Sequence, residues 1–221
     1  MQVGERCGPS GRLELDTKVG KMTVEEVEEF TYLGTRISSK CDEETEIDMR
    51  LSKANKCAGM MNHLLRAKDL AISTRMRIYQ TIIRPTILYG AETWILNRKV
   101  QEKLLRWERK IIRRILGGKK TEEGYVRRTN NEIYEIYKAP TIDQVVKARR
   151  LQWLGHIERM PEERIVKRIE SKAPEYKKRR GRPRKRWKQS VLEDLKEKKI
   201  EDWRNKALNR KTWRNITKLW A

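Results

Sequence analysis

The sequence predicts a mainly α-helical protein: a helical bundle with a short N-terminal β-hairpin and a basic C-terminal helical module. Two patterns lead to this fold class. Apolar residues recur at helical spacing from residue 47 onward, whereas the alternation typical of strands is confined to the first 39 residues. Only 37% of the 221 residues are hydrophobic and 38% are charged, so the expected core is small.

The strand signals lie at the N-terminal end. Residues 1–11 are expected to form an irregular tail, and residues 12–39 a β-hairpin. The stretches RLELD and VEEFTYLGTRIS alternate in a way that suits two strands, with Gly20 and Lys21 near the turn between them.

The predicted bundle spans residues 40–118 and its first helix begins near Asp42. One face of this helix has apolar residues spaced by 4, 3, 4, 3 and 4: Ile47, Leu51, Ala54, Ala58, Met61 and Leu65. Ser73 or Thr74 is expected to cap a second helix. That helix carries Met76, Tyr79, Ile83, Ile87 and Gly90. Pro85 predicts a kink or a restart within it.

A third helix is predicted after Asn97, a residue type that caps helices well. Glycines 117 and 118 mark its end. The inward face carries Val100, Leu104, Trp107, Ile111 and Ile115. The opposite face is strongly basic and is a candidate nucleic-acid surface: Lys103, Arg106, Lys110, Arg113 and Arg114.

Residues 119–171 are expected to form a helical connector. NNEIYEIY predicts a short helix ended by Pro140, and Thr141 a helix that runs to Pro161. The predicted inward stripe of the second helix is Ile142, Val146, Arg149, Trp153, Ile157 and Met160.

Residues 187–221 predict two or three short helices. They contain Trp187, Trp203, Trp213 and Trp220. Tryptophans on helical faces are more often core anchors than base-stacking platforms. We therefore expect Trp107, Trp153, Trp203 and Trp213 in the core.

The charge of the chain indicates a polyanionic partner. The formal net charge is +22 and the pI about 10.1. Residues 1–50 hold 7 Lys and Arg against 12 Asp and Glu, residues 51–170 hold 27 against 13, and residues 171–221 hold 19 against 6. Nucleic acid is the first candidate and an anionic membrane surface the second. Because no apolar run is long enough to cross a bilayer, no membrane partner is predicted.

Metal, cofactor and catalytic sites are not predicted. Cys7, Cys41 and Cys57 form no CxxC pair, and His63 and His156 lie outside any zinc-binding spacing. Cys57 and His63 are interpreted as structural, and the scattered cysteines favour a reduced compartment. The acidic residues are expected on charged helix surfaces rather than converging on cations, which argues against nucleotidyl transfer or nuclease chemistry.

The stretch KKRRGRPRKRW at residues 177–187 is the core of a basic loop predicted at 172–186. Three functional interpretations stand beside a solvated loop without a ligand. An AT-hook would place arginines around Gly181 and Pro183 in a narrow A·T minor groove. A nuclear import signal needs only the clustered cations. Contact with phosphates through Arg180, Arg182, Arg184, Lys185 and Arg186 is the third, and the favoured one.

Five stretches in order resemble the reverse transcriptases of LINE-type retrotransposons, which lack long terminal repeats. EEFTYLGTRIS resembles the primer grip, the hairpin that closes the polymerase palm, and RPTILYGAETW resembles the thumb signature. RRLQWLGHIERM, RGRPRKRW and ALNRKTWRNI resemble the terminal segments. The likeness runs from about residue 12 to the end.

The resemblance implies a thumb-like bundle at residues 40–118 and a primer-grip-like hairpin at 12–39. Phe30, Tyr32, Leu33 and Gly34 match the primer-grip motif, and in an intact enzyme the loop that they form would abut the primer strand. The thumb signature falls on Tyr89, Gly90, Glu92 and Trp94, which are interpreted mainly as packing residues. The family's catalytic carboxylates precede the primer grip and have no counterpart in this sequence.

The sequence thus predicts a catalytically inactive, C-terminal fragment of such a reverse transcriptase. It is expected to bind RNA or DNA with low specificity, to need no cofactor and to be nuclear. The alternative is a nuclear protein-interaction module whose basic loop serves as an import signal, read by an import receptor, or as a weak AT-hook.

Overall fold

The computed structural model describes residues 12–17, 20–25, 27–38, 43–171 and 185–218. The chain divides into two compact units, Met1–Glu46 and Ile47–Ala221. The predicted fold class is confirmed: the chain is mainly helical, with short strands near the N-terminus.

The described residues of the first unit form two hairpins rather than the single one predicted. Strand β1 (Arg12–Thr17) pairs with β2 (Gly20–Glu25), and β3 (Glu29–Tyr32) pairs with β4 (Thr35–Ser38), both antiparallel. The prediction of one strand through VEEFTYLGTRIS was wrong because the chain reverses at Leu33 and Gly34. Their φ angles of 47° and 79° give the left-handed two-residue turn that suits tight hairpins.

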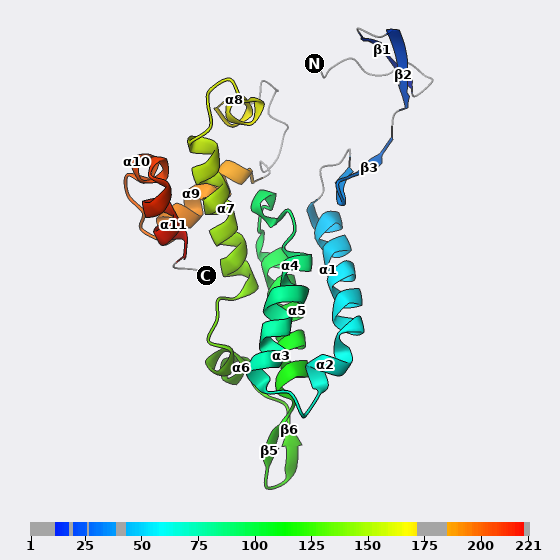
Figure 1. Cartoon of the computed structure of the whole chain (residues 1–221), viewed down its shortest axis with the longest axis vertical. Coiled ribbons are helices and arrows are strands. Elements are labelled where there is room, and N and C mark those ends of the chain that lie inside the picture. The colour runs from blue at the N-terminus through cyan, green and yellow to red at the C-terminus, as the bar shows by residue number, and fades with distance from the viewer. Residues whose placement is uncertain (1–11, 18–19, 26, 39–42, 172–184, 219–221) are drawn as a thin grey trace. The chain divides into compact units, whose positions relative to one another are not determined.

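The predicted bundle is present as a set of helices, which belong to the second unit except for the first turn of the first helix (Figure 1). In chain order its elements are α1 (Glu43–Met60), α2 (Asn62–Arg66), α3 (Ile72–Ile78), the π-helical turn η1 (Tyr79–Ile83), α4 (Arg84–Ile87), the 3-10 turn η2 (Ala91–Thr93) and α5 (Arg98–Leu116).

The predicted interruption near Pro85 is present as a change of helix type. The π-helical turn η1 comes directly before Arg84 and Pro85, so the missing proline N–H falls where the backbone pattern is already irregular. The predicted caps Ser73 and Thr74 were wrong. Helix α3 begins at Ile72 after Ala71, and no side chain caps it.

Helix α5 follows the sequence prediction closely. The side chain of Asn97 accepts a hydrogen bond from the backbone N–H of Val100 at 2.8 Å. Gly117 ends the helix with a φ of 70°, which favours glycine.

A third hairpin follows α5, at a place where no strand was predicted. Strand β5 (Lys119–Thr121) pairs with β6 (Gly124–Val126). The segment KKTEEGYV is too short and too polar to show a clear alternation, so the expectation of a purely helical connector needs correction. Three helices continue the connector: α6 (Asn130–Tyr137), α7 (Ile142–Glu158) and α8 (Ile165–Ser171).

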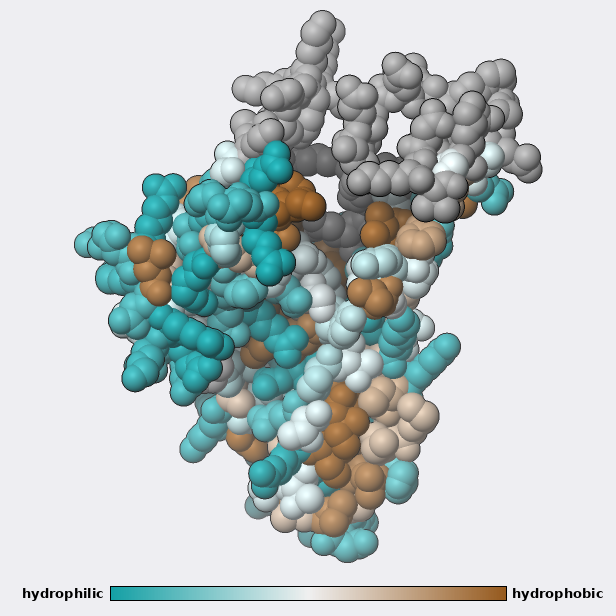
Figure 2. Space-filling view, turned by 45° about the horizontal axis from the view of Figure 1, so that its top comes forward, coloured by the Kyte–Doolittle hydropathy of each residue, from teal (hydrophilic) through white to brown (hydrophobic). Residues whose placement is uncertain are grey.

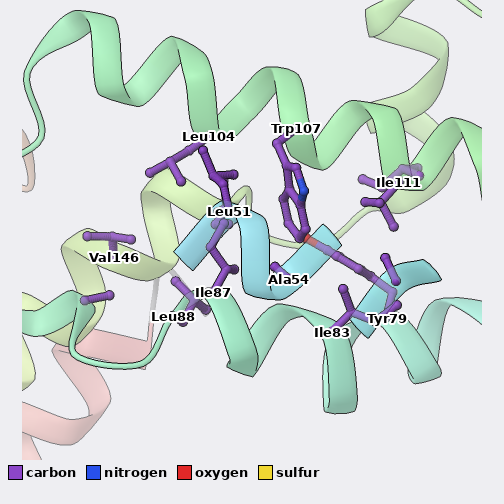
Figure 3. Packing of buried hydrophobic residues seen from close by; sticks show 14 of the residues in the cluster. Leu51, Ala54, Tyr79, Ile83, Ile87, Leu88, Leu104, Trp107, Ile111 and Val146 are labelled. Carbon is purple, nitrogen blue, oxygen red and sulfur yellow. The ribbon is translucent and has the colours of Figure 1, made fainter. Parts of the chain in front are cut away.

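The first hydrophobic cluster fills the bundle between α1, η1, α4, α5 and the start of α7. Trp107 points from α5 toward Tyr79 and Ala54 (Figure 3), and its ring centroid lies 6.4 Å from that of Tyr79. Most residues of the predicted stripes of α1 and α5 are buried here.

A buried carboxylate, Glu108, joins three elements beneath this cluster. It accepts hydrogen bonds from the Tyr79 hydroxyl at 2.8 Å and from the backbone N–H of Ile142 at 2.9 Å. The expectation that acidic residues lie on helix surfaces was wrong here. Glu108 is fully buried on α5, where it ties η1 to the first turn of α7.

This carboxylate predicts a pH-dependent stability. Burial raises the pKa of Glu108 from 4.5 to about 6, although the hydrogen bonds from Ile142 and Tyr79 oppose the shift. The folded state therefore holds the proton more tightly than the unfolded state, so its contribution to stability is lost as pH rises through this range. Between the two pKa values the free energy of unfolding should fall by about 2 kcal/mol.

Glu108→Gln removes this titration while keeping hydrogen-bonding capacity. The variant's free energy of unfolding relative to the wild-type protein should rise across that pH range and then level off. Urea unfolding of both proteins at a series of pH values measures this difference in free energy of unfolding. A difference that does not change with pH would contradict the raised pKa of Glu108.

The C-terminal helices build a second hydrophobic cluster against the other half of α7. They are α9 (Trp187–Glu197), α10 (Trp203–Leu208) and α11 (Arg210–Lys218). The buried residues are Ala148, Leu151, Leu154, Val191, Leu195, Ala207 and Trp213. Hydrophilic side chains cover most of the face that these helices present in Figure 2.

Helix α7 changes its inward face between the two clusters, which corrects the predicted stripe. Ile142 and Val146 belong to the first cluster, whereas Leu151 and Leu154 belong to the second. Trp153 is consequently half-buried and belongs to neither cluster, so its placement in the core was wrong.

The other tryptophans follow the expectation to different degrees. Trp107 and Trp213 are buried, and Trp203 and Trp187 are partly buried against the second cluster. Trp220 lies outside the described residues.

A buried ion pair fastens the second cluster to the bundle. The Nε of Arg150 donates to Asp194 Oδ2 at 2.7 Å, and its Nη1 donates to the carbonyl oxygen of Trp94 at 2.9 Å. Burial raises the pKa of Asp194, and the neighbouring Arg150 opposes that shift. Nearby, the Nε1 of Trp187 donates to the carbonyl oxygen of Glu92 at 2.8 Å.

Candidate nucleic-acid interface

The predicted basic face of α5 lines an open hollow of about 580 Å³ between α5 and α1. Its walls are Lys103, Arg106, Lys110, Arg113 and Trp107 from α5, Leu51 and Asn55 from α1, and Arg127. The floor is fixed by a hydrogen bond of 2.9 Å from Trp107 Nε1 to Asn55 Oδ1.

A second hollow of about 370 Å³ adjoins the first and reaches the β5–β6 hairpin. The two hollows share Arg113 and Arg127. The second is lined by Arg66, Arg113, Arg114, Gly117, Gly118, Tyr125, Val126, Arg127 and Arg128. We call the two hollows together the α5 groove.

The α5 groove is electropositive along its whole length. No Asp or Glu is among the described residues that line it. Partial burial lowers the pKa of Arg113 below its ordinary value, and the neighbouring guanidinium groups of Arg127 and Arg109 lower it further. Cations gathered in this way attract phosphates and release counterions when a polyanion binds.

Two of the predicted binding residues also have partners within the protein. Arg113 donates from Nη2 to Asn130 Oδ1 at 2.5 Å and from Nε to the carbonyl oxygen of Arg128 at 3.3 Å. Lys103 forms an exposed ion pair with Asp48 of α1. Arg106 and Lys110 are exposed, and they project the charge of α5 into solvent.

Three further predicted site residues belong to the first unit. Tyr32, Leu33 and Gly34 form the tip of the β3–β4 hairpin in the first unit, with Tyr32 and Leu33 exposed. Their placement confirms a hairpin at the primer-grip-like segment, and contact with a nucleic acid stays a prediction.

The basic loop is described only at its end. Arg180, Arg182 and Arg184 lie outside the described residues. Lys185 forms an ion pair with Glu193, and Arg186 precedes α9, where its backbone N–H donates to Gln189 Oε1 at 3.0 Å.

Most residues of the thumb signature have structural roles: they pack, form a turn or accept hydrogen bonds through their backbone carbonyls. Trp94 is buried, Gly90 has a φ of 73°, and the carbonyl oxygens of Glu92 and Trp94 hold Trp187 and Arg150. Tyr89 is exposed and stacks with the guanidinium of Arg50, whose Cζ lies 4.6 Å from the ring centroid.

Sequence reasoning missed the part of the groove contributed by the third hairpin and α2. The β5–β6 hairpin turns back beside the end of α5 and so brings Tyr125, Arg127 and Arg128 to Arg114. Arg66 joins them because α2 packs against α5. The two arginines after GYV, Arg127 and Arg128, are visible in the sequence as clustered charge. Because the hairpin was not predicted, they could not be assigned to the groove.

The described residues contain no group of three or more His, Cys, Asp or Glu suited to a metal ion. Cys57 is partly buried against the first cluster, and His63 is exposed on α2. Within the described part of the chain, no helix is long and apolar enough to cross a membrane.

Comparison with known proteins gives a distant relationship. A transposon-derived protein of Caenorhabditis elegans is 26% identical over 199 residues, which cover 86% of this chain and 70% of the relative. This chain is related to a transposon-derived protein. No family model matches the chain, and no solved structure matches it either.

Proposed function

We propose that this chain binds RNA and DNA non-specifically, through phosphate contacts in the α5 groove, as a thumb-like part of a LINE-type retrotransposon reverse transcriptase. The observation that carries the proposal is the continuous run of cations in the groove with no described carboxylate among its lining residues. The relationship to a transposon-derived protein and the resemblance of the sequence motifs support the same assignment.

We also propose that this chain is catalytically inactive by itself. Phosphoryl-transfer enzymes position cations with converging carboxylates, and the described residues provide no such group. Primer extension that exceeds background with Mg²⁺ or Mn²⁺ and disappears on removing the metal would contradict this part.

Charge removal in the groove tests the binding site. The triple variant Arg106→Gln, Lys110→Gln and Arg127→Gln should lower affinity for duplex DNA and for RNA by about tenfold or more. The slope of log K against log salt on duplex DNA should shrink by about 0.9 for each phosphate that the groove no longer neutralises. Fluorescence anisotropy across a salt series measures both quantities.

A matched variant controls for net charge. Arg77→Gln, Lys196→Gln and Lys211→Gln remove the same charge from exposed positions that do not line the groove. This variant should bind much more tightly than the groove variant. Equal losses in the two variants would mean that overall charge, rather than the groove, drives binding.

The basic loop is proposed as a second phosphate-contacting segment and as a nuclear import signal. Changing Arg180, Arg182, Arg184, Lys185 and Arg186 to Gln tests both roles, by binding and by cellular location. If Arg182→Gln alone abolished a preference for A·T-rich duplex, the segment would be an AT-hook instead.

One observation favours a second candidate function, a protein-interaction module. Ile165, Val166 and Ile169 on α8 are exposed and lie on neighbouring positions of one helical face. If the chain bound neither RNA nor DNA at low salt, this candidate would replace the first.

A further inference from the structure

The β5–β6 hairpin presents an aromatic ring to solvent. Tyr125 is 79% exposed. It lies opposite Lys120 in the hairpin register, and the neighbouring Val126 is also exposed. This ring contributes little to the stability of the fold, because most of its surface stays in water.

Gly118 allows the chain after α5 to pass close beside this tyrosine. A Cβ at Gly118 would lie 3.3 Å from the carbonyl oxygen of Val126 and 3.4 Å from the Cβ of Tyr125. The base of the tyrosine is therefore held against the end of α5, while its ring remains accessible at the edge of the second hollow.

Several guanidinium groups line the same hollow. Arg66, Arg114, Arg127 and Arg128 come from α2, α5 and the segment after β6. The Nε of Arg128 is buried without a hydrogen-bond partner, so this side chain has a donor that the described structure does not use. An unused buried donor is costly, and a phosphate that drew the guanidinium toward it would remove that cost.

We propose that the second hollow binds a single-stranded nucleic acid, with a phosphate held by Arg66, Arg114 and Arg128 and the adjacent base stacked on Tyr125. This inference rests on the proposed nucleic-acid binding and adds a preference to it. Duplex bases are already stacked on their neighbours, so only an unpaired base offers a free face to the ring.

Tyr125→Ala tests the stacking contact. The variant should lose about tenfold in affinity for a single-stranded oligonucleotide of mixed sequence. Its affinity for the matched duplex should stay unchanged, because the phosphate contacts of the groove remain. Tyr125→Phe keeps the aromatic face and should bind the single strand like the wild-type protein. Thermal melting checks that the exposed substitution leaves the fold intact.

The other outcomes separate this inference from the proposed function. Wild-type protein that binds neither form would overturn both. Wild-type protein that binds both forms, with single-strand affinity unchanged in Tyr125→Ala, would retain the groove and reject the stacking site. An equal loss on single strand and duplex would likewise reject it, because stacking on an unpaired base cannot affect the duplex.

Discussion

Replacing Gly155 with alanine should destabilise the protein by about 3 kcal/mol or more, although alanine is the better helix former. Gly155 is buried in α7, and the indole of Trp213 lies directly on it. An added Cβ would be 2.2 Å from Trp213 Nε1 and 2.3 Å from its Cδ1. The indole cannot easily move, since Nε1 donates to the carbonyl oxygen of Leu151 at 2.8 Å.

Gly59 provides the matched control. It also lies inside a helix, α1, but an added Cβ there would meet nothing within 4 Å. Gly59→Ala should therefore raise the free energy of unfolding by up to about 1 kcal/mol. Chemical denaturation of both variants measures the contrast. A Gly155→Ala protein as stable as the wild type would show that α11 does not pack on α7 as described.

Trp107→Ala should destabilise the bundle by about 3–5 kcal/mol, the range for large aromatic residues removed from cores. Only 6% of Trp107 is exposed. The change would leave a cavity between α1, η1 and α5, and would also remove the hydrogen bond to Asn55. Such a loss is a large share of the stability of a domain of this size.

Trp153→Ala is the comparison for this substitution, because Trp153 lies on a helix but in neither cluster. Its effect should be clearly smaller than that of Trp107→Ala. Thermal melting of both variants decides the matter. Equal destabilisation would indicate that Trp153 is a core residue after all, as its position in the sequence stripe had predicted.

Local signals predicted those parts of the fold that depend on local chemistry. The stripe of α1 and the two ends of α5 follow from apolar spacing, from Asn97 and from Gly117, each of which acts within one or two turns of its own helix. The hairpin at Leu33 and Gly34 was found through the resemblance, whereas the strand pattern alone passed over it.

The features that were missed depend on contacts between distant segments. Glu108 is buried because Tyr79 and Ile142 donate hydrogen bonds to it, and the apolar spacing of α5 does not predict these partners. The position of Trp153 depends on the change of inward face along α7. For the candidate site, the α5 face was visible in the sequence, but Arg66 and Arg128 join it only through tertiary packing.

Helix α7 contributes residues to both hydrophobic clusters, and this determines where the chain can be divided. The second cluster consists of a wall supplied by residues 148–154 and a cover supplied by α9, α10 and α11. The cover is anchored across the interface by the Arg150–Asp194 pair and by Trp187. Fragments 1–171 and 185–221, made separately and mixed, should therefore reassemble by complementation, and the cover alone should gain helicity only when its missing wall is supplied.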